Sequence, residues 1–472
     1  MERRLTIRYI ICDYLSAVIA WGLLFLFRKM AIENVEGSVW RSMVEDANFW
    51  EGIALVPIGW LALYFIQGTY RNVLRKSRLK ELQLTLTATL IGGVVIFFVL
   101  MLDDRVDSYR YYYLSFLFLL AVHFVLTYSC RVMITTNTAH KVHSRLIGFP
   151  TVMIGVGKKA YETYLELDGQ ETYSGERFVG YLKVGEEEVN ANLANIMPEL
   201  GSIADLQNIV KEHDVEEVII ALEDSDKEQI GVIVQAAKVC GDLIIRVTPD
   251  ARDLIVGSVK INSIFHSPLI TINNRLMEEW QYNVKRLFDI VASFLAMVIL
   301  SPVYLVTAIV IKSTSKGPVF YAQERIGYHG KPFKMHKFRS MYVDAEVGGP
   351  ALASDDDPRI TPFGRFMRKV RLDEIPQFYN VLKGTMSIVG PRPERRYYIN
   401  QIVERKPEYL LLHRIKPGIT SWGQVKFGYA ENVDEMVERM RYDLLYLENM
   451  SIATDIKIML YTVLIILQGR GK

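Results

Sequence analysis

The stretch KRLFDIVASFLAMVILSPVYLVTAIVIKSTSKG, Lys285 to Gly317, decides the fold, because it determines on which side of a membrane the last third of the chain lies. It is long and apolar enough to be interpreted as a transmembrane helix. Ser301-Pro302 interrupts it near the middle, and proline removes a backbone hydrogen bond and bends a helix. Basic residues flank both ends, namely Lys285, Arg286, Lys312 and Lys316. Because lysine and arginine stay on the cytoplasmic side, neither end is predicted to be translocated.

A re-entrant helix over residues 286–311, which enters the membrane and returns to the same side, agrees with both features. The alternative is a fifth span kinked by proline, which membrane helices tolerate. That alternative carries everything after Ile311 out of the cell, whereas the re-entrant helix keeps it in the cytoplasm. The basic flanks favour the re-entrant helix.

Upstream, the first third of the chain contains four segments that are long and apolar enough to cross a bilayer. They are Ile7–Phe27, Ile53–Tyr70, Leu84–Leu102 and Tyr111–Met133. Basic residues gather at the N-terminus, after the second segment and after the fourth, whereas the third connection is acidic. This asymmetry predicts a multi-pass four-helix bundle over residues 1–140, with both of its ends in the cytoplasm.

The composition agrees with a membrane protein and argues against other classes. Hydrophobic residues make up 50% of the 472 residues, and the mean hydropathy is +0.14. The net charge of +2 gives no electrostatic reason to expect nucleic-acid binding. Three cysteines without a C-x-x-C spacing predict neither a disulfide framework nor a zinc site.

From Leu146 the pattern changes to strands that alternate with helices, which predicts a Rossmann-like α/β domain over residues 146–265. Its first strand runs into Gly155-Val-Gly157, a turn that suits a helix N-terminus and a bound phosphate. The second strand ends in YLKVG (Tyr181–Gly185), without the acidic residue that binds a ribose hydroxyl in dinucleotide-binding domains. A structural or assembly role is therefore favoured over dinucleotide binding, and the reaction centre is expected elsewhere.

Further along, RLDEIPQFYNVLKG (Arg371–Gly384) places Asp373 and Glu374 side by side ahead of Pro376. Apolar residues at helical spacing lie on both sides, so the pair is predicted between an interfacial amphipathic helix and a second helix. Carboxylates at a helix start are stabilised as anions, and proline is tolerated in the first turn. An ionised aspartate can attack phosphorus, and Mg²⁺ commonly binds one or two carboxylates plus substrate phosphates. The simpler interpretation is a helix cap.

Basic residues on stiff segments accompany this acid pair. KMHKFRSM places Lys337 and Arg339 on one side of a predicted strand, and SIVGPRPE holds Arg392 between two prolines. Lys416 lies beside another Pro-Gly turn. Such cations suit contacts with phosphate oxygens, and arginine can make them bidentate. Together with the acid pair they indicate chemistry on an anionic phosphate.

These motifs, taken in order, resemble those of the bacterial sugar transferases, the polyprenyl-phosphate hexose-1-phosphate transferases. They are KRLFDIVASFLAMVILSP, QERIGYHGKPFKMHKFRSM, DPRITPFGRFMRKVRLDEIPQFYNVLKGTMSIVGPRPE and KPGITSWGQV. The resemblance implies an α/β catalytic domain over residues 280–472, with a re-entrant helix broken at Ser301-Pro302 and interfacial amphipathic helices. The four N-terminal helices and the middle domain resemble the long members, which begin exopolysaccharide or O-antigen synthesis.

The resemblance also implies an activity. Asp373 would attack the β-phosphorus of a UDP-sugar, expected to be UDP-glucose or UDP-galactose, and release UMP. The phosphosugar on the aspartate would then pass to undecaprenyl phosphate. Glu374 would help to bind Mg²⁺, and the phosphate-handling positions correspond to Lys337, Arg368 and Arg392. Cytosolic UDP-sugars and the lipid phosphate meet at the inner membrane, so the site is expected to face the cytoplasm among inner-membrane lipids.

One departure from the family pattern concerns the last motif. Many relatives have QVNGRN where this chain has QVKFGY (Gln424–Tyr429), so an arginine is missing. This leaves the nucleotide or sugar contacts around Lys426 open. The run DIKIMLYTVLIILQG (Asp455–Gly469) is too short to span a membrane and is predicted to dock against the re-entrant helix.

Two other functions stay open. Asp355-Asp356-Asp357 contains an Asp-x-Asp pattern that glycosyltransferases use for metal, although a solvated acidic turn before Pro358 is the simpler interpretation. An ordinary glycosyltransferase would release UDP. The second alternative is a non-catalytic membrane scaffold whose middle domain senses a nucleotide. Whether that domain binds a ligand, forms a homodimer or passes a signal is not decided by the sequence.

Overall fold

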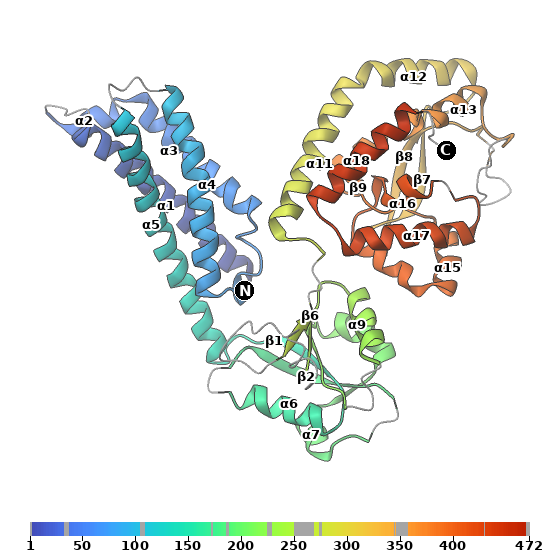
Figure 1. Ribbon diagram of the computed structural model, residues 1–472, viewed down its shortest axis with the longest axis horizontal. Coiled ribbons are helices and arrows are strands. Elements are labelled where there is room, and N and C mark those ends of the chain that lie inside the picture. The colour runs from blue at the N-terminus through green and yellow to red at the C-terminus, as the bar shows by residue number, and fades with distance from the viewer. Residues whose placement is uncertain are drawn as a thin grey trace. The chain divides into compact units, whose positions relative to one another are not determined.

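The computed structural model divides the chain into two compact units, and each is described by itself. The first unit comprises Met1–Gly148 with Gly169–Gly175, and the second comprises Phe149–Asp168 with Glu176–Lys472. Figure 1 labels the helices and strands of both units. The structure describes residues 2–32, 37–103, 109–170, 173–185, 188–223, 229–249, 269–272, 276–343, 345, 357–428 and 430–468.

Four long helices dominate the described part of the first unit. They are α1 (Glu2–Ala31), α3 (Ala47–Ile66), α4 (Arg78–Asp103) and α5 (Tyr109–His143), accompanied by the short α2 (Val39–Val44) and η1 (Val73–Arg75). All four are long and apolar enough to cross a membrane, so the four predicted segments are confirmed as long apolar helices. Large apolar side chains such as Leu55, Ile91 and Val125 are exposed, as expected of helices whose outer faces meet lipid.

A buried polar network holds this bundle together. Arg131 of α5 forms an ion pair with Asp13 of α1, with 2.8 Å between Nη2 and Oδ2. Arg131 also donates to Thr85 Oγ1 of α4 at 3.0 Å, and the Tyr70 hydroxyl donates to Asp13 at 2.9 Å. Because charges within an apolar bundle are costly unless paired, this network fixes how the helices align.

A six-stranded sheet forms the first part of the second unit, in the order β3-β2-β1-β4-β5-β6. Its strands are β1 (Phe149–Ile154), β2 (Glu176–Lys183), β3 (Glu199–Ser202), β4 (Glu217–Ile220), β5 (Ile244–Val247) and β6 (Ile270–Ile272). Neighbouring strands are parallel except β5 and β6, which are antiparallel. The intervening helices are α6 (Lys158–Asp168), α7 (Ala191–Ile196), η2 (Ile203–Asp205), α8 (Leu206–Glu212) and α9 (Ile230–Val239).

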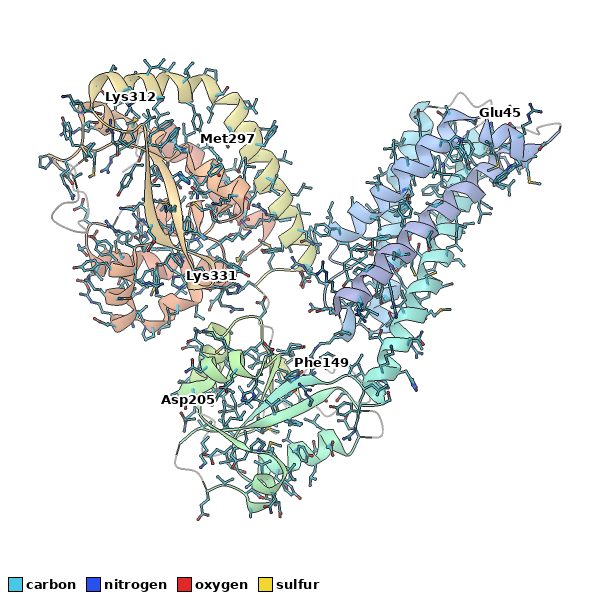
Figure 2. The ribbon with its side chains drawn as sticks, turned by 180° about the vertical axis from the view of Figure 1, so that it is seen from behind. Glu45, Phe149, Asp205, Met297, Lys312 and Lys331 are labelled. Atoms are coloured by element: carbon cyan, nitrogen blue, oxygen red, sulfur yellow. The ribbon has the colours of Figure 1, made fainter. Side chains whose placement is uncertain are left out.

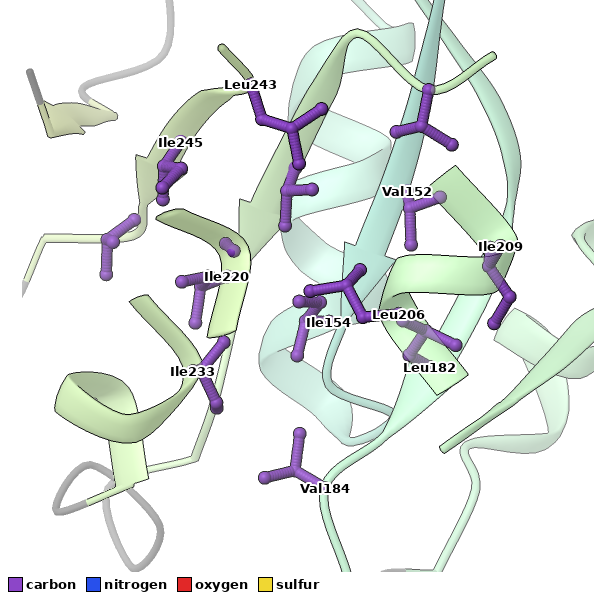
Figure 3. Packing of buried hydrophobic residues seen from close by; sticks show 14 of the residues in the cluster. Val152, Ile154, Leu182, Val184, Leu206, Ile209, Ile220, Ile233, Leu243 and Ile245 are labelled. Carbon is purple, nitrogen blue, oxygen red and sulfur yellow. The ribbon is translucent and has the colours of Figure 1, made fainter. Parts of the chain in front are cut away.

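The predicted alternation of strands and helices is therefore confirmed. Because β1 is central, its apolar side chains are buried on both faces of the sheet, as parallel sheets require. Val152 and Ile154 of β1 pack with Leu182 of β2 and Ile220 of β4, while Ile233 of α9 covers them (Figure 3). The predicted end of this domain, residue 265, lies outside the described residues.

Two helices joined at a sharp bend follow. The first, α11 (Glu279–Ile299), meets α12 (Ser301–Thr314) at 59°, so the predicted break at Ser301-Pro302 is confirmed. Pro302 lies in the first turn of α12, where a missing N–H breaks no helical hydrogen bond. Many apolar side chains along the bent pair are exposed, among them Phe294, Val298, Ile299, Leu305 and Ile309. Figure 2 shows side chains projecting outward along both helices, from Met297 to Lys312.

The rest of the unit is a small α/β region. A hairpin of β7 (Phe320–Ile326) and β8 (Pro332–Phe338) is antiparallel, and β9 (Ser387–Val389) pairs in parallel with β10 (Gly418–Thr420). The helical elements are η4 (Tyr328–Gly330), α13 (Pro362–Lys369), η5 (Leu372–Glu374), α14 (Gln377–Lys383), α15 (Arg396–Arg405), η6 (Pro407–Arg414), α16 (Trp422–Lys426), α17 (Val433–Glu448) and α18 (Ile452–Leu467).

The near-terminal helix α18 is 16 residues long and docks on the start of α11 through polar contacts. Asp455 accepts from Lys285 Nζ at 2.6 Å, and Gln281 accepts the backbone N–H of Ile452 at 3.1 Å. Ile458 of α18 is fully buried, in the cluster that also contains Val389 of β9. The opposite face of α18 exposes Leu460 and other apolar side chains.

Candidate active site

Asp373 and Glu374 lie between two helices, as predicted, but they occupy a turn of their own. Arg371 takes up a left-handed conformation, with φ of 56°, directly after α13. This conformation reverses the chain, so the two acids form η5 and Pro376 begins the next helix as its N-cap. Both carboxylates are buried, with Asp373 6% and Glu374 5% exposed. Two adjacent buried acids need compensating charge.

Three cations surround the Glu374 carboxylate. Lys337 Nζ lies 2.8 Å and Arg392 Nη1 lies 3.5 Å from Oε1, while Arg371 Nη1 lies 3.7 Å from Oε2. Burial by itself raises the pKa of Glu374, but Lys337, Arg392 and Arg371 outweigh it and hold the pKa well below its usual range. Glu374 is therefore ionised at neutral pH.

Asp373 has a different environment. Burial raises its pKa, and this effect exceeds the opposing influence of Lys337, while the neighbouring Glu374 raises it further. Lys337 Nζ lies 3.9 Å from Asp373 Oδ2, which is beyond hydrogen-bond distance. The two carboxylates are thus differentiated: Glu374 is tightly held as an anion, whereas Asp373 is held more loosely and is the more basic.

The position of Lys337 depends on packing between β8 and α14. Asn380 of α14 donates from its amide to Lys334 O at 2.8 Å and accepts the His336 N–H at 3.0 Å. The helix that follows the acid pair is thereby attached to the strand that carries Lys337. Met335, Val381 and Met386 fill the buried space beside it. Sequence reasoning missed Asn380, which lies between the apolar positions Tyr379 and Val381 of α14.

The segment that carries Arg392 is held by buried ion pairs. Glu394 lies between Arg325 of β7 and Arg439 of α17, with N–O distances of 3.0 Å and 2.6 Å. Asp443 of α17 accepts the backbone N–H of Gly423 at 2.8 Å, and burial raises its pKa to about 6. These pairs place Arg392 beside Glu374, and sequence reasoning missed them because their partners come from distant elements.

The remaining predicted cations have separate positions. Arg368 donates to Ser340 Oγ at 3.1 Å and is near enough to Asp373 to lower its pKa against the effect of burial. Arg339 instead donates to Ser315 O at 2.9 Å and to Lys316 O, closing the C-terminus of α12. In a strand, residues two apart point to the same face, which would place Arg339 beside Lys337. β8 ends at Phe338, so this rule does not extend to Arg339.

Lys416 lies at the other end of α14 from the acid pair. Burial lowers its pKa, and the nearby Arg286 lowers it further. Arg286 itself donates to the carbonyls of Val381 and Leu382 at the end of α14. Among the described residues, the structure therefore brings Lys337, Arg368, Arg371 and Arg392 to the acid pair, whereas Arg339 and Lys416 contact neither carboxylate.

Two further sequence features are the motif at Gln424–Tyr429 and the acidic run at Asp355–Asp357. Lys426 Nζ lies 5.1 Å and 5.4 Å from the ring centres of Trp422 and Tyr461, so its charge is engaged by aromatic faces. Tyr429, Asp355 and Asp356 lie outside the described residues. Asp357 is paired with Arg359 at 2.5 Å.

The acid pair offers donors that suit a hard cation. Ionised carboxylate oxygens are the ligands Mg²⁺ prefers, and Glu374 is ionised. No group of three or more His, Cys, Asp or Glu side chains that could hold a metal occurs among the described residues. A magnesium ion at this position would therefore take most of its ligands from substrate phosphates and water.

Known proteins are similar to this chain over its middle and C-terminal parts. A family model described as bacterial sugar transferase matches residues 280–469, and one described as a CoA-binding domain matches residues 66–245. The chain is 39% identical over 46% of its length to a UDP-N-acetylgalactosamine-undecaprenyl-phosphate N-acetylgalactosaminephosphotransferase of Aeromonas hydrophila, of which the match covers 51%. It is 38% identical over 56% of its length to a UDP-glucose:undecaprenyl-phosphate glucose-1-phosphate transferase of Klebsiella pneumoniae, of which 57% is covered.

A third relative matches over more of both chains. It is an undecaprenyl-phosphate galactose phosphotransferase of Salmonella typhimurium, 31% identical over 68% of this chain and 68% of the relative. The chain matches only about half the length of the first two relatives. The matches to all three concern proteins that are named for transfer to undecaprenyl phosphate.

Proposed function

Because the chain belongs to the bacterial sugar transferase family, we propose that it transfers a sugar-1-phosphate from a UDP-sugar to undecaprenyl phosphate and releases UMP. The observation that carries this proposal is the difference between two adjacent buried carboxylates. Glu374 is held as an anion by three cations, whereas Asp373 is more loosely held and more basic. One acid is thus suited to attack phosphorus and the other to organise charge around it.

The reaction we propose has two steps at one phosphorus atom. In the first, an oxygen of Asp373 attacks the β-phosphorus of the UDP-sugar, and the bond from that phosphorus to the bridging oxygen breaks, so that UMP leaves. In the second, a phosphate oxygen of undecaprenyl phosphate attacks the same phosphorus, and the aspartyl–phosphorus bond breaks. The carboxylate of Asp373 is restored, and the lipid carries a diphosphate-linked sugar.

The cations supply the charge that this chemistry requires. Lys337 and Arg392 share one oxygen of Glu374, and cations beside the acid pair can stabilise the negative charge of a bound diphosphate. Arg368 adds positive charge on the Asp373 side. We propose that Glu374 also holds Mg²⁺ together with diphosphate oxygens, where the ion would neutralise charge on the leaving UMP.

Substrate class and cellular place are part of the proposal. The relatives' names include glucose, galactose and N-acetylgalactosamine, so a UDP-linked hexose or N-acetylhexosamine is the class we assign. Transfer to this lipid is the first membrane step of exopolysaccharide, capsule or O-antigen synthesis. The inner membrane, with the catalytic site in the cytoplasm, is the place where both substrates meet.

We further propose that the α11–α12 pair is re-entrant rather than a fifth span. The 59° bend and the exposed apolar side chains on both helices support this arrangement. The domains then correspond to residues 1–140, a Rossmann-like domain over 146–265 and a catalytic domain over 280–472. A homodimer is an assembly we also propose to test.

The deciding experiment presents a panel of UDP-sugars with undecaprenyl phosphate and measures the released nucleotide. Release of UMP, dependent on the lipid acceptor, is expected. Release of UDP would instead support an ordinary glycosyltransferase, and no turnover with any sugar would support the scaffold alternative. The Asp373→Asn protein is the matched control, because it differs by one charge and almost no volume.

A further inference from the structure

The turn Gly155-Val-Gly157 lies at the place where α/β sheets usually bind a ligand. It follows β1, and the sheet order puts β2 on one side of β1 and β4 on the other. In such sheets, ligands bind outside the carboxyl ends of the strands at the point where the connections diverge. The matching family model is described as a CoA-binding domain. CoA or a dinucleotide bound here would place its diphosphate at the N-terminus of α6.

That position is already taken by a side chain of the protein itself. Glu223 follows the end of β4, and its Oε1 accepts the backbone N–H of Lys159 at 2.8 Å. Lys159 lies in the first turn of α6, where backbone N–H groups lack partners within the helix. A carboxylate there satisfies both the unpaired donor and the positive end of the helix dipole, as a phosphate would.

The two glycines of the turn are also accounted for by neighbours within the chain. A Cβ atom at Gly157 would lie 2.4 Å from Glu223 Oε1, so glycine is needed for the carboxylate to approach. At Gly155, where φ is +119°, a Cβ atom would lie 2.2 Å from the carbonyl oxygen of Ala221. Both glycines that suggested a phosphate-binding turn therefore pack closely against residues that follow β4, and the Ala221 carbonyl requires glycine at position 155.

An ion pair occupies the end of β2, the strand on the other side of β1 from β4. At the end of β2, Lys183 pairs with Glu199 of β3 at 2.8 Å. Val184 and Gly185 follow directly, so among the described residues no acidic side chain ends this strand, whereas Glu186 and Glu187 lie outside the described residues. The carboxylate of Glu223 at the N-terminus of α6 is therefore the feature that does not fit the diphosphate of CoA or of a dinucleotide.

We propose that Glu223 is a built-in anion that occupies the phosphate position of the Gly155–Gly157 turn, so that the domain excludes CoA and dinucleotides from this crevice. The diphosphate of either ligand would meet a like charge, and it could reach the Lys159 N–H only by displacing the hydrogen bond that Glu223 already accepts. The domain then contributes through its fold and its surfaces rather than through a bound cofactor. This inference does not depend on the proposed transfer reaction.

The test uses the full-length protein in detergent and three probes: CoA, ADP and inorganic phosphate at matched ionic strength. Titration calorimetry of the wild type is expected to show no saturable binding of CoA or of ADP. Thermal unfolding in phosphate is compared between the wild type and Glu223→Ala, in which the N-terminus of α6 loses its anion. Phosphate is expected to raise the Tm of Glu223→Ala more than that of the wild type. Glu223→Gln keeps an acceptor oxygen but no charge. The rise in its Tm caused by phosphate is expected to lie between those of the wild type and Glu223→Ala.

Saturable binding of CoA or ADP that is unchanged in Arg392→Met, and therefore lies outside the proposed transfer site, would overturn the inference. An equal effect of phosphate on the Tm of the wild type and of folded Glu223→Ala would also overturn it. If Glu223→Ala does not fold, the wild-type titrations and the Glu223→Gln comparison decide the question. Because none of these readouts measures sugar transfer, failure of the proposed function would leave their outcome unchanged.

Discussion

Lys337 Nζ lies 2.8 Å from Glu374 Oε1, a contact between residues that are 37 positions apart in the chain. It joins the strand β8 to the turn η5, and it is a charge-assisted hydrogen bond between two largely buried side chains. The same ammonium also lies 3.9 Å from Asp373 Oδ2. Lys337 therefore influences both acids, and substitutions at Lys337, Asp373 and Glu374 can distinguish the roles of the two carboxylates.

Replacing Asp373 by asparagine is expected to reduce UMP release by at least about 10³-fold, because the amide cannot act as the nucleophile. The fold should be retained, since burial already disfavours the charge of Asp373. Measuring UMP release checks the loss of activity, and thermal unfolding checks that the fold is retained. Asp434→Asn, which removes an exposed carboxylate paired with Arg405 on the surface, is the control and should stay within a few-fold of wild type. Similar losses in both variants would contradict a nucleophilic role.

Replacing Glu374 by glutamine is expected to lower both the rate and its dependence on Mg²⁺. It should also lower the free energy of unfolding by about 3 kcal/mol, because three cations lose the anion that they surround. The low folded-state pKa of Glu374 stabilises the protein above its ordinary pKa of about 4.3, and this contribution is lost as pH falls toward the folded value. Thermal unfolding between neutral and acidic pH measures it. A wild-type pH profile of stability in the variant would contradict this account.

The pH dependence of the reaction should report Asp373. Activity requires its ionised form, and burial raises its pKa, so activity should fall as pH decreases through that raised value. Lys337→Met removes the cation that most lowers this pKa, so the acid limb of kcat/KM should move to higher pH. Lys337→Arg keeps the charge and should leave the limb near its wild-type position. An unmoved limb in Lys337→Met would show that the titrating group is not Asp373.

Arg339 and Arg392 should behave differently, although both were predicted to handle phosphate. Arg339→Met removes the hydrogen bonds that close α12, and is expected to reduce stability by about 2 kcal/mol with little change in KM for the UDP-sugar. Arg392→Met should raise that KM, because its guanidinium lies beside Glu374. Steady-state kinetics and thermal unfolding of both variants distinguish the two roles. A raised KM in Arg339→Met with unchanged stability would place Arg339 in the substrate site.

Membrane topology can be checked with single cysteines in a background that lacks Cys12, Cys130 and Cys240. Ser313→Cys, exposed near the end of α12, should react with a membrane-impermeant maleimide only in inside-out vesicles. Ser38→Cys, in the connection after the first span, should react only from outside, in intact cells. Labelling of Ser313→Cys in intact cells would show a fifth span and would separate the site from cytosolic UDP-sugars.

The sequence was sufficient for features that depend on local pattern. The four spans follow from hydropathy over about 20 consecutive residues, and the break at Ser301-Pro302 follows from the backbone chemistry of proline. The alternation of strands and helices after Leu146 also follows from periodicity. The location of Asp373 and Glu374 between two helices was visible for the same reason.

Only the tertiary structure decided which charges meet. Lys337 faces Glu374, whereas Arg339, two residues further on, closes α12, because the strand ends between them. Glu223 occupies the turn at Gly157 although 66 residues separate them in the chain, since β1 and β4 are neighbours in the sheet. Hydropathy and turn chemistry act within one segment of chain, whereas the ionisation of a buried group depends on charges that packing brings from other segments.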